Sequence, residues 1–147
     1  MKTLEIKPRI GVGPIRFGMT RDALRKHLGE PDADDAAREW YLEDMAIDFD
    51  PSGSVVFVEL ARSENYKAML NGKCLHELDA DQAVAHLQAI APYDENDPEL
   101  GYAYRFPELQ MSLWRPAIPD GEQAPDDPTG RCFESVGVGG EGYFNPE

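Results

Sequence analysis

Cysteine and histidine are scarce in this sequence, which has two cysteines, Cys74 and Cys132, and three histidines among 147 residues. Two cysteines permit one disulfide at most, which excludes a disulfide framework, and we expect both thiols to be reduced and buried. No segment approaches the ~20 consecutive apolar residues of a membrane span, and the first residues lack the apolar stretch of a signal peptide. The sequence therefore predicts a cytoplasmic protein that does not bind membranes.

Basic side chains are also scarce, with 14 lysines and arginines against 28 aspartates and glutamates, a formal net charge of −14 at pH 7. Residues 1–28 carry seven basic and two acidic side chains (+5), which leaves −19 on the other 119 residues. Such a surface repels nucleic acid and anionic lipid and attracts a basic protein. The alternative is that the charge serves solubility alone.

The hydrophobic content is sufficient for the core of one folded domain over residues 1–147, because 41% of the residues are hydrophobic and 10% are aromatic. Residues 19–31 predict a short helix capped by Thr20, and residues 78–92 predict a second helix with Asp79 as its cap. Three strand-like runs follow each helix: 39–42, 45–50 and 54–60 after the first, and 101–106, 108–116 and 131–140 after the second.

A helix followed by antiparallel strands, twice over, predicts an α+β fold. We expect two approximate repeats, residues 15–61 and 75–140, each a helix plus an antiparallel meander, with both helices packed on one face of the sheet. The two halves share little identity, so the repeat is one of organisation.

Residues 48–59 (DFDPSGSVVFVE) match a calcium-binding loop position by position, from Asp48, Asp50 and Ser52 to a closing Glu59. The flanking residues decide against that interpretation, because they alternate like strands on both sides whereas a calcium loop lies between helices. Pro51 and Gly53 are typical of a tight turn. The sequence therefore predicts a β-hairpin here and no calcium site.

Three pieces of the sequence resemble a known pattern: Ile15 to Pro31 (IRFGMTRDALRKHLGEP), Phe49 to Leu60 (FDPSGSVVFVEL) and Leu113 to Arg115 (LWR). They are similar to immunity proteins of bacterial polymorphic toxin systems. The broader pattern resembles the repeat of β-lactamase inhibitor protein and of small outer-membrane assembly lipoproteins, although no lipobox cysteine stands near the start. The resemblance covers about a third of the chain and implies a fold more than an activity.

An enzymatic interpretation rests on Cys74 and His76, which lie on the same side of an expected strand and could form a thiol nucleophile or half of a metal site. The second half offers only Cys132, so the paired ligands of a zinc site are missing. We expect neither a metal nor another cofactor.

A binding interpretation rests on side chains that alternation directs away from the helices. Met45, Ile47 and Phe49 are expected to point inward, as are Val56, Val58 and Leu60 on the next strand. The opposite face then mixes aromatic and acidic side chains: Tyr41, Asp48, Asp50, Phe57, Glu59 and Trp114. Aromatic anchors among carboxylates suit a basic protein partner. The alternative is that a second layer covers this face and buries Phe57 and Trp114.

Residues 116–130 (PAIPDGEQAPDDPTG) form an acidic, proline-rich connection that is longer than a hairpin turn requires. Its carboxylates, Asp120, Glu122, Asp126 and Asp127, are candidates for contact with the same partner. A solvated connector without a binding role is the alternative.

These patterns lead to two main hypotheses, with a module of purely structural role as the third. The first is a non-enzymatic immunity protein that neutralises a cognate bacterial toxin, and the acidic balance suits a basic, nuclease-like toxin whose cleft accepts carboxylates in place of phosphates. The second is a small enzyme or small-ligand-binding protein that uses Cys74 and His76.

Overall fold

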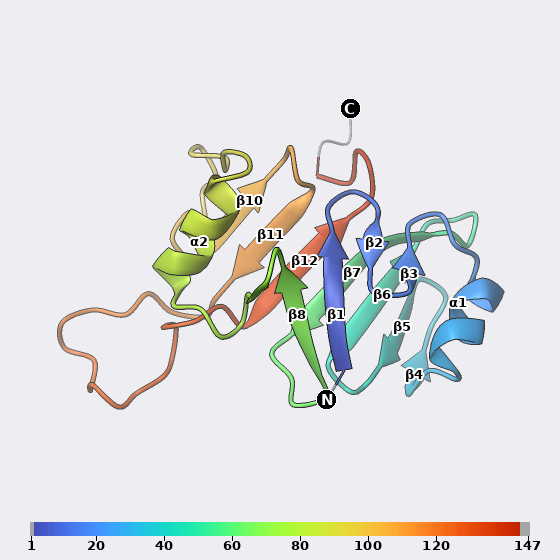
Figure 1. The fold of residues 1–147 in the computed structure, drawn as a ribbon, viewed down its shortest axis with the longest axis horizontal. Coiled ribbons are helices and arrows are strands. Elements are labelled where there is room, and N and C mark those ends of the chain that lie inside the picture. Colours follow the sequence, from blue (N-terminus) through green and yellow to red (C-terminus); the bar gives the residue numbers. More distant parts are fainter. Residues whose placement is uncertain (1, 145–147) are drawn as a thin grey trace.

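A computed structural model describes residues 2–144 as two sheets and two helices (Figure 1). The large sheet contains, in spatial order, β10 (Ala103–Phe106), β11 (Met111–Trp114), β12 (Ser135–Gly139), β7 (Val55–Ala61), β6 (Met45–Phe49), β5 (Arg38–Tyr41) and β4 (Ala33–Asp34). The small sheet contains β3 (Ile15–Arg16), β2 (Gly11–Val12), β1 (Lys2–Lys7), β8 (Tyr66–Leu70) and β9 (Lys73–Cys74). The helices are α1 (Arg21–Leu28) and α2 (Ala80–Gln88).

The core lies on one face of the large sheet, which we call the inner face. Figure 1 shows β1 and β8 running across this sheet, with α1 near one end of it and α2 near the other. One hydrophobic cluster joins side chains from both sheets and both helices: Leu4 and Ile6 of β1, Tyr66 and Ala68 of β8, Ile47 and Val58 of the large sheet, Leu24 of α1, and Ala83 and Leu87 of α2. The opposite surface of the large sheet is the outer face.

The two meanders of the large sheet meet where β7 pairs antiparallel with β12. The α+β class agrees with this arrangement of two helices and antiparallel strands. The finer prediction of two helix-on-sheet repeats is not confirmed, because the molecule is mostly strand and part of the core is covered by the small sheet. The small sheet was not predicted: β1 and β8 pair in parallel although about 60 residues separate them.

Both helices begin close to where the sequence predicted. Thr20 caps α1 and accepts a hydrogen bond from the Ala23 N–H at 3.2 Å. Asp79 occupies the predicted cap position of α2 but makes no such side-chain bond. The helix α2 ends at Gln88, so Ile90 lies beyond the helix, and its side chain is exposed. Neither helix within residues 2–144 has the length and apolar character needed to cross a membrane.

The predicted hairpin of residues 45–61 is confirmed, with β6 paired antiparallel to β7. Asp50 organises the turn, since its Oδ1 accepts hydrogen bonds from the Ser52 N–H, the Ser52 hydroxyl and the Ser54 N–H. A register shift near Phe49 places Val55 in the core opposite Phe49 and leaves Val56 half-buried. The predicted inward direction of Val56 is therefore wrong, because strict alternation fails at a bulge.

Candidate functional site

The outer face of the large sheet carries most of the aromatic and acidic side chains that the sequence singled out. Pairing places Asp48 beside Phe57, Glu59 beside Gly137, and Trp114 beside Ser135. Paired residues of an antiparallel sheet share a face. Asp48, Phe57, Glu59 and Trp114 therefore lie on the outer face as expected, but they differ in how far they are available to a partner.

Tyr41 does not belong to this surface. It pairs with Met45 on the inner face and is 3% exposed, and its hydroxyl donates a 2.7 Å hydrogen bond to Glu39 Oε1. Its neighbour Trp40 takes the outer position and lies beside Arg38, whose Cζ is 5.9 Å from the ring centroid. The predicted contact of Tyr41 with a partner is wrong, because β5 directs Arg38 and Trp40 to the outer face and Tyr41 to the inner face.

The carboxylates at the centre of the outer face are neutralised within the chain. Arg38 of β5 forms two bonds with Asp48, one of them 2.9 Å from Nη2 to Oδ2, and the same nitrogen lies 3.7 Å from Glu59 Oε1. Paired carboxylates attract a basic partner less than free ones do. Asp48 and Glu59 are thus weaker candidates for contact than the sequence indicated.

Phe57 is covered by the end of the described chain. Its ring stacks on Tyr143 with centroids 4.5 Å apart, Phe144 meets it edge-on at 6.0 Å, and only 8% of Phe57 is exposed. Gly137 makes room for this ring, since a Cβ there would come within 2.7 Å of Phe57 Cζ. The covering layer is an aromatic segment rather than a second sheet. Tyr143 itself is 40% exposed, and sequence reasoning missed it.

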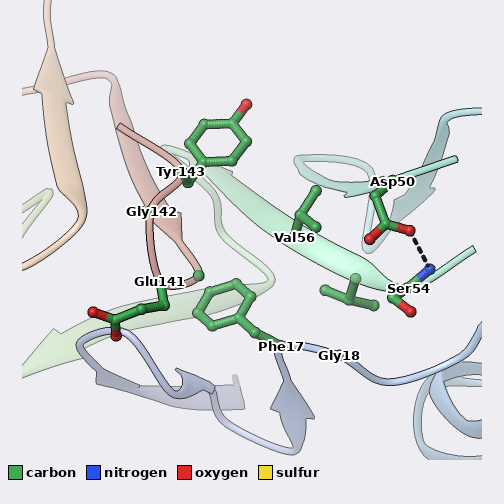
Figure 2. A pocket seen from close by; sticks show the side chains of 10 residues that line it. Phe17, Gly18, Asp50, Ser54, Val56, Glu141, Gly142 and Tyr143 are labelled. Carbon is green, nitrogen blue, oxygen red and sulfur yellow. Dashed lines mark hydrogen bonds between the residues drawn. The ribbon is translucent and has the colours of Figure 1, made fainter. Parts of the chain in front are cut away.

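Asp50 lies at one end of a cleft of about 290 Å³, which we call the Asp50–Glu141 cleft. Figure 2 shows Asp50 and Ser54 on one side, Glu141 and Tyr143 on the other, and Phe17 and Val56 between them. Three segments far apart in sequence meet here. The Gly18 N–H donates to the Val55 carbonyl at 2.8 Å, and the Gly140 N–H donates to the Val56 carbonyl at 2.9 Å.

Trp114 belongs to a second candidate region, the Trp114 region, which contains the exposed side chains Leu100, Tyr102, Trp114 and Ile118. These four account for most of the exposed large hydrophobic side chains among the described residues, with exposures of 37–46%. Trp114 lies on the outer face, whereas Tyr102 adjoins Arg115 on the opposite side of the sheet. Trp114 pairs with Ala103, and the Tyr102 carbonyl accepts a hydrogen bond from the Arg115 N–H at 2.9 Å. Ile118 packs on Gly101, where a Cβ would come within 2.8 Å of Ile118 Cδ1.

Acidic residues are close in the chain to the Trp114 region. The Glu99 carbonyl accepts the Tyr102 N–H, and the Trp114 carbonyl accepts the Glu134 N–H at 2.9 Å. Ile118 lies in the acidic loop 116–130, which extends from the body of the molecule beside α2 (Figure 1). Strand alternation in the sequence predicted that Trp114 lies on the outer face. Leu100, Tyr102 and Ile118 lie in loops, where no periodic pattern predicts their exposure.

The four carboxylates of loop 116–130 play different parts. Asp120 accepts the N–H groups of Glu122 and Gln123, and Asp127 accepts the Thr129 N–H at 3.0 Å. Hydrogen bonds from Thr129 lower the pKa of Asp127. Two carboxylates therefore shape the loop.

Glu122 and Asp126 are exposed, and no hydrogen bond or ion pair holds their carboxylates within the described chain. Those two carboxylates are free to meet a partner.

Cys74 and His76 do not form a reactive pair. Burial and the hydrogen bond to Glu77 raise the pKa of the Cys74 thiol, which opposes thiolate formation. The His76 ring instead bonds the Leu60 carbonyl at 2.8 Å, and burial lowers its pKa. Residues 2–144 contain no group of three histidine, cysteine, aspartate or glutamate side chains placed to hold a metal ion.

Comparison with protein-family models, with curated proteins and with solved structures finds no match for this chain. The resemblance to immunity proteins therefore rests on the three sequence pieces alone, and the argument about function rests on the surfaces described above.

Proposed function

We propose that this protein is a non-enzymatic binding protein of the immunity class, which neutralises a cognate bacterial toxin by covering the toxin's active site. The observation that carries the proposal is the Trp114 region, where Trp114 is 44% exposed on the outer face and Ile118 is 44% exposed in an acidic loop. An apolar centre with a charged rim is the usual anatomy of a protein interface.

The charge of the chain favours a basic partner. The net charge of −14 accelerates encounter with a basic surface, and a nuclease-like toxin cleft built for phosphates accepts carboxylates. We also propose that the two halves of the chain are helix-plus-meander repeats and that the protein works in the cytoplasm. The three sequence pieces that resemble immunity proteins support both statements.

The proposal predicts a toxin domain encoded beside this protein's gene, and that domain is the partner for its test. A gene neighbourhood without such a domain would contradict the proposal. Co-expression of the chain should restore growth of a bacterial host that makes the toxin. By calorimetry we expect Trp114→Ala and Ile118→Ala each to weaken toxin binding about tenfold or more, as for central anchors of an interface.

Ile10→Ala is the matched control, because Ile10 is also exposed (56%) but lies in the turn between β1 and β2. It should leave toxin affinity within about twofold. Failure of the chain to protect the host would overturn the proposed function. Protection together with unchanged toxin affinity in both Trp114→Ala and Ile118→Ala would mean that the toxin binds another surface of the protein.

A further inference from the structure

The Asp50–Glu141 cleft combines an apolar floor with two carboxylates that have no cationic partner. Phe17, Val55 and Val56 form the floor, and Gly140 packs against it so closely that a Cβ would come within 3.2 Å of Phe17 Cβ. Within residues 2–144, no lysine, arginine or histidine nitrogen lies within 4.0 Å of Asp50 or Glu141. The carboxylates of Asp48 and Glu59 on the outer face, in contrast, are both paired with Arg38.

The two carboxylates are also held differently. Asp50 Oδ1 accepts three hydrogen bonds from Ser52 and Ser54, which fix the side chain, while no described donor bonds its Oδ2. Bonds from Ser52 and Ser54 lower the pKa of Asp50 and keep it ionised at neutral pH. Glu141 is exposed at the opposite end of the cleft, on the same side as Tyr143 and with its carboxylate directed away from Asp50, and Phe17 offers aromatic surface between the two (Figure 2).

From this arrangement we infer that the Asp50–Glu141 cleft binds the side chain of a lysine or arginine carried by the protein partner. The inference rests on the proposed function for the identity of the partner. The methylene stem of such a side chain packs on the apolar floor, and its cationic head meets the free Oδ2 of Asp50, while Glu141 adds negative charge at the opposite end. The cleft lies beside Tyr143, which stacks on Phe57 of the outer face, so one partner surface can reach both.

The cleft can be tested without a toxin by titrating the protein with n-butylammonium chloride and following backbone amide shifts by NMR. Gly18, Gly140 and Gly142 line the cleft and serve as reporters. We expect saturable shifts of these amides with butylammonium and none with sodium chloride at equal ionic strength. Shifts of equal size with uncharged 1-butanol would mean that the carboxylates play no part and would overturn the inference.

Asp50→Asn combined with Glu141→Gln removes both charges, and the amide side chain introduced at the first position keeps an acceptor oxygen for Ser52 and Ser54. We expect this double variant to weaken butylammonium binding at least tenfold, with Glu122→Gln as a control that changes one charge outside the cleft. An unchanged affinity in the double variant would overturn the cation site.

A final arm measures toxin binding by the same double variant, where we expect a loss of at least tenfold. Butylammonium binding together with unchanged toxin affinity would mean that the cleft takes free amines, and the partner assignment would then be wrong. If the protein neutralises the toxin but its cleft does not bind butylammonium, this inference is overturned and the proposed function still holds.

Discussion

Glu39 has no solvent-exposed surface, and three side chains hold it. Arg21 Nη1 and Arg25 Nη2 lie 2.6 and 2.9 Å from its Oε2, and Tyr41 donates to its Oε1. The two arginines belong to α1 and the other two residues to β5, so this cluster ties the helix to the sheet. Loss of Glu39 leaves Arg21 and Arg25, whose side chains are 26% and 31% exposed, without their shared carboxylate.

We expect Glu39→Gln to lower the free energy of unfolding by about 3 kcal/mol, measured by urea denaturation at pH 7, because it leaves two arginines without their shared carboxylate. Glu122→Gln, a change of the same type at an exposed loop residue, should leave stability nearly unchanged. Equal stabilities of the two variants would show that the Glu39 cluster contributes little.

Glu39 also makes stability depend on pH. Burial by itself raises the pKa of Glu39, but hydrogen bonds from Arg25, Tyr41 and Arg21 outweigh it and lower the pKa below its ordinary value of 4.5. The stabilisation is therefore complete above about pH 4.5 and is lost as the pH falls through the lower pKa of the folded state. Urea denaturation from pH 3 to 6 should show this loss in the native sequence, and a smaller loss in Glu39→Gln.

The thiol of Cys74 should react slowly in the folded protein, because burial and Glu77 raise its pKa and keep it protonated at pH 7. We expect iodoacetamide to label Cys74 much more slowly in the native protein than in the urea-unfolded chain, with sites assigned by mass spectrometry. Rapid native labelling that abolishes an activity would favour the enzymatic hypothesis instead.

Among the elements, the β6–β7 hairpin shows why a motif needs its context. Asp50 Oδ1 is already occupied by Ser52 and Ser54, and Glu59 extends along β7 between Ala46 and Gly137. A closing ligand in an extended strand cannot fold back onto a loop-bound ion. Calorimetric titration with calcium should therefore give no micromolar binding. Such binding, if lost in Asp48→Ala, would contradict the prediction.

The loop of residues 116–130 contains two kinds of carboxylate. Asp120 and Asp127 accept backbone hydrogen bonds within the loop, whereas Glu122 and Asp126 do not. Reversal of Glu122 and Asp126 to lysine should weaken toxin binding and leave the thermal midpoint nearly unchanged, because neither carboxylate is bonded within the described chain. Asp127→Lys should lower the midpoint as well, since Asp127 accepts the Thr129 N–H. Unchanged toxin affinity after the double reversal would make the loop a connector.

At the scale of the whole molecule, the net charge of −14 should govern the rate of encounter with a basic partner. We expect the association rate constant with the toxin to fall at least about tenfold between ~50 and ~500 mM sodium chloride, with a smaller change in the dissociation rate, measured by stopped-flow tryptophan fluorescence. A salt-independent association rate would mean that the acidity serves solubility alone.

The sequence by itself determined the features that depend on neighbouring residues. Thr20 caps the start of α1, Pro51 and Gly53 lie in a turn between two strands, and Met45 and Ile47 point into the core. Caps, turns and alternation act over a few residues, so a single sequence reveals them. The charge balance is likewise a property of composition.

Only the tertiary structure decided which surfaces are covered. Alternation places Phe57 and Trp114 on one face, but Tyr143 covers the first and nothing described covers the second. The Asp50–Glu141 cleft joins residues 17–18, 50–56 and 140–143, and β1 finds β8 across about 60 residues. Such contacts form because they bury apolar surface between distant segments, and no local pattern records which segments will meet.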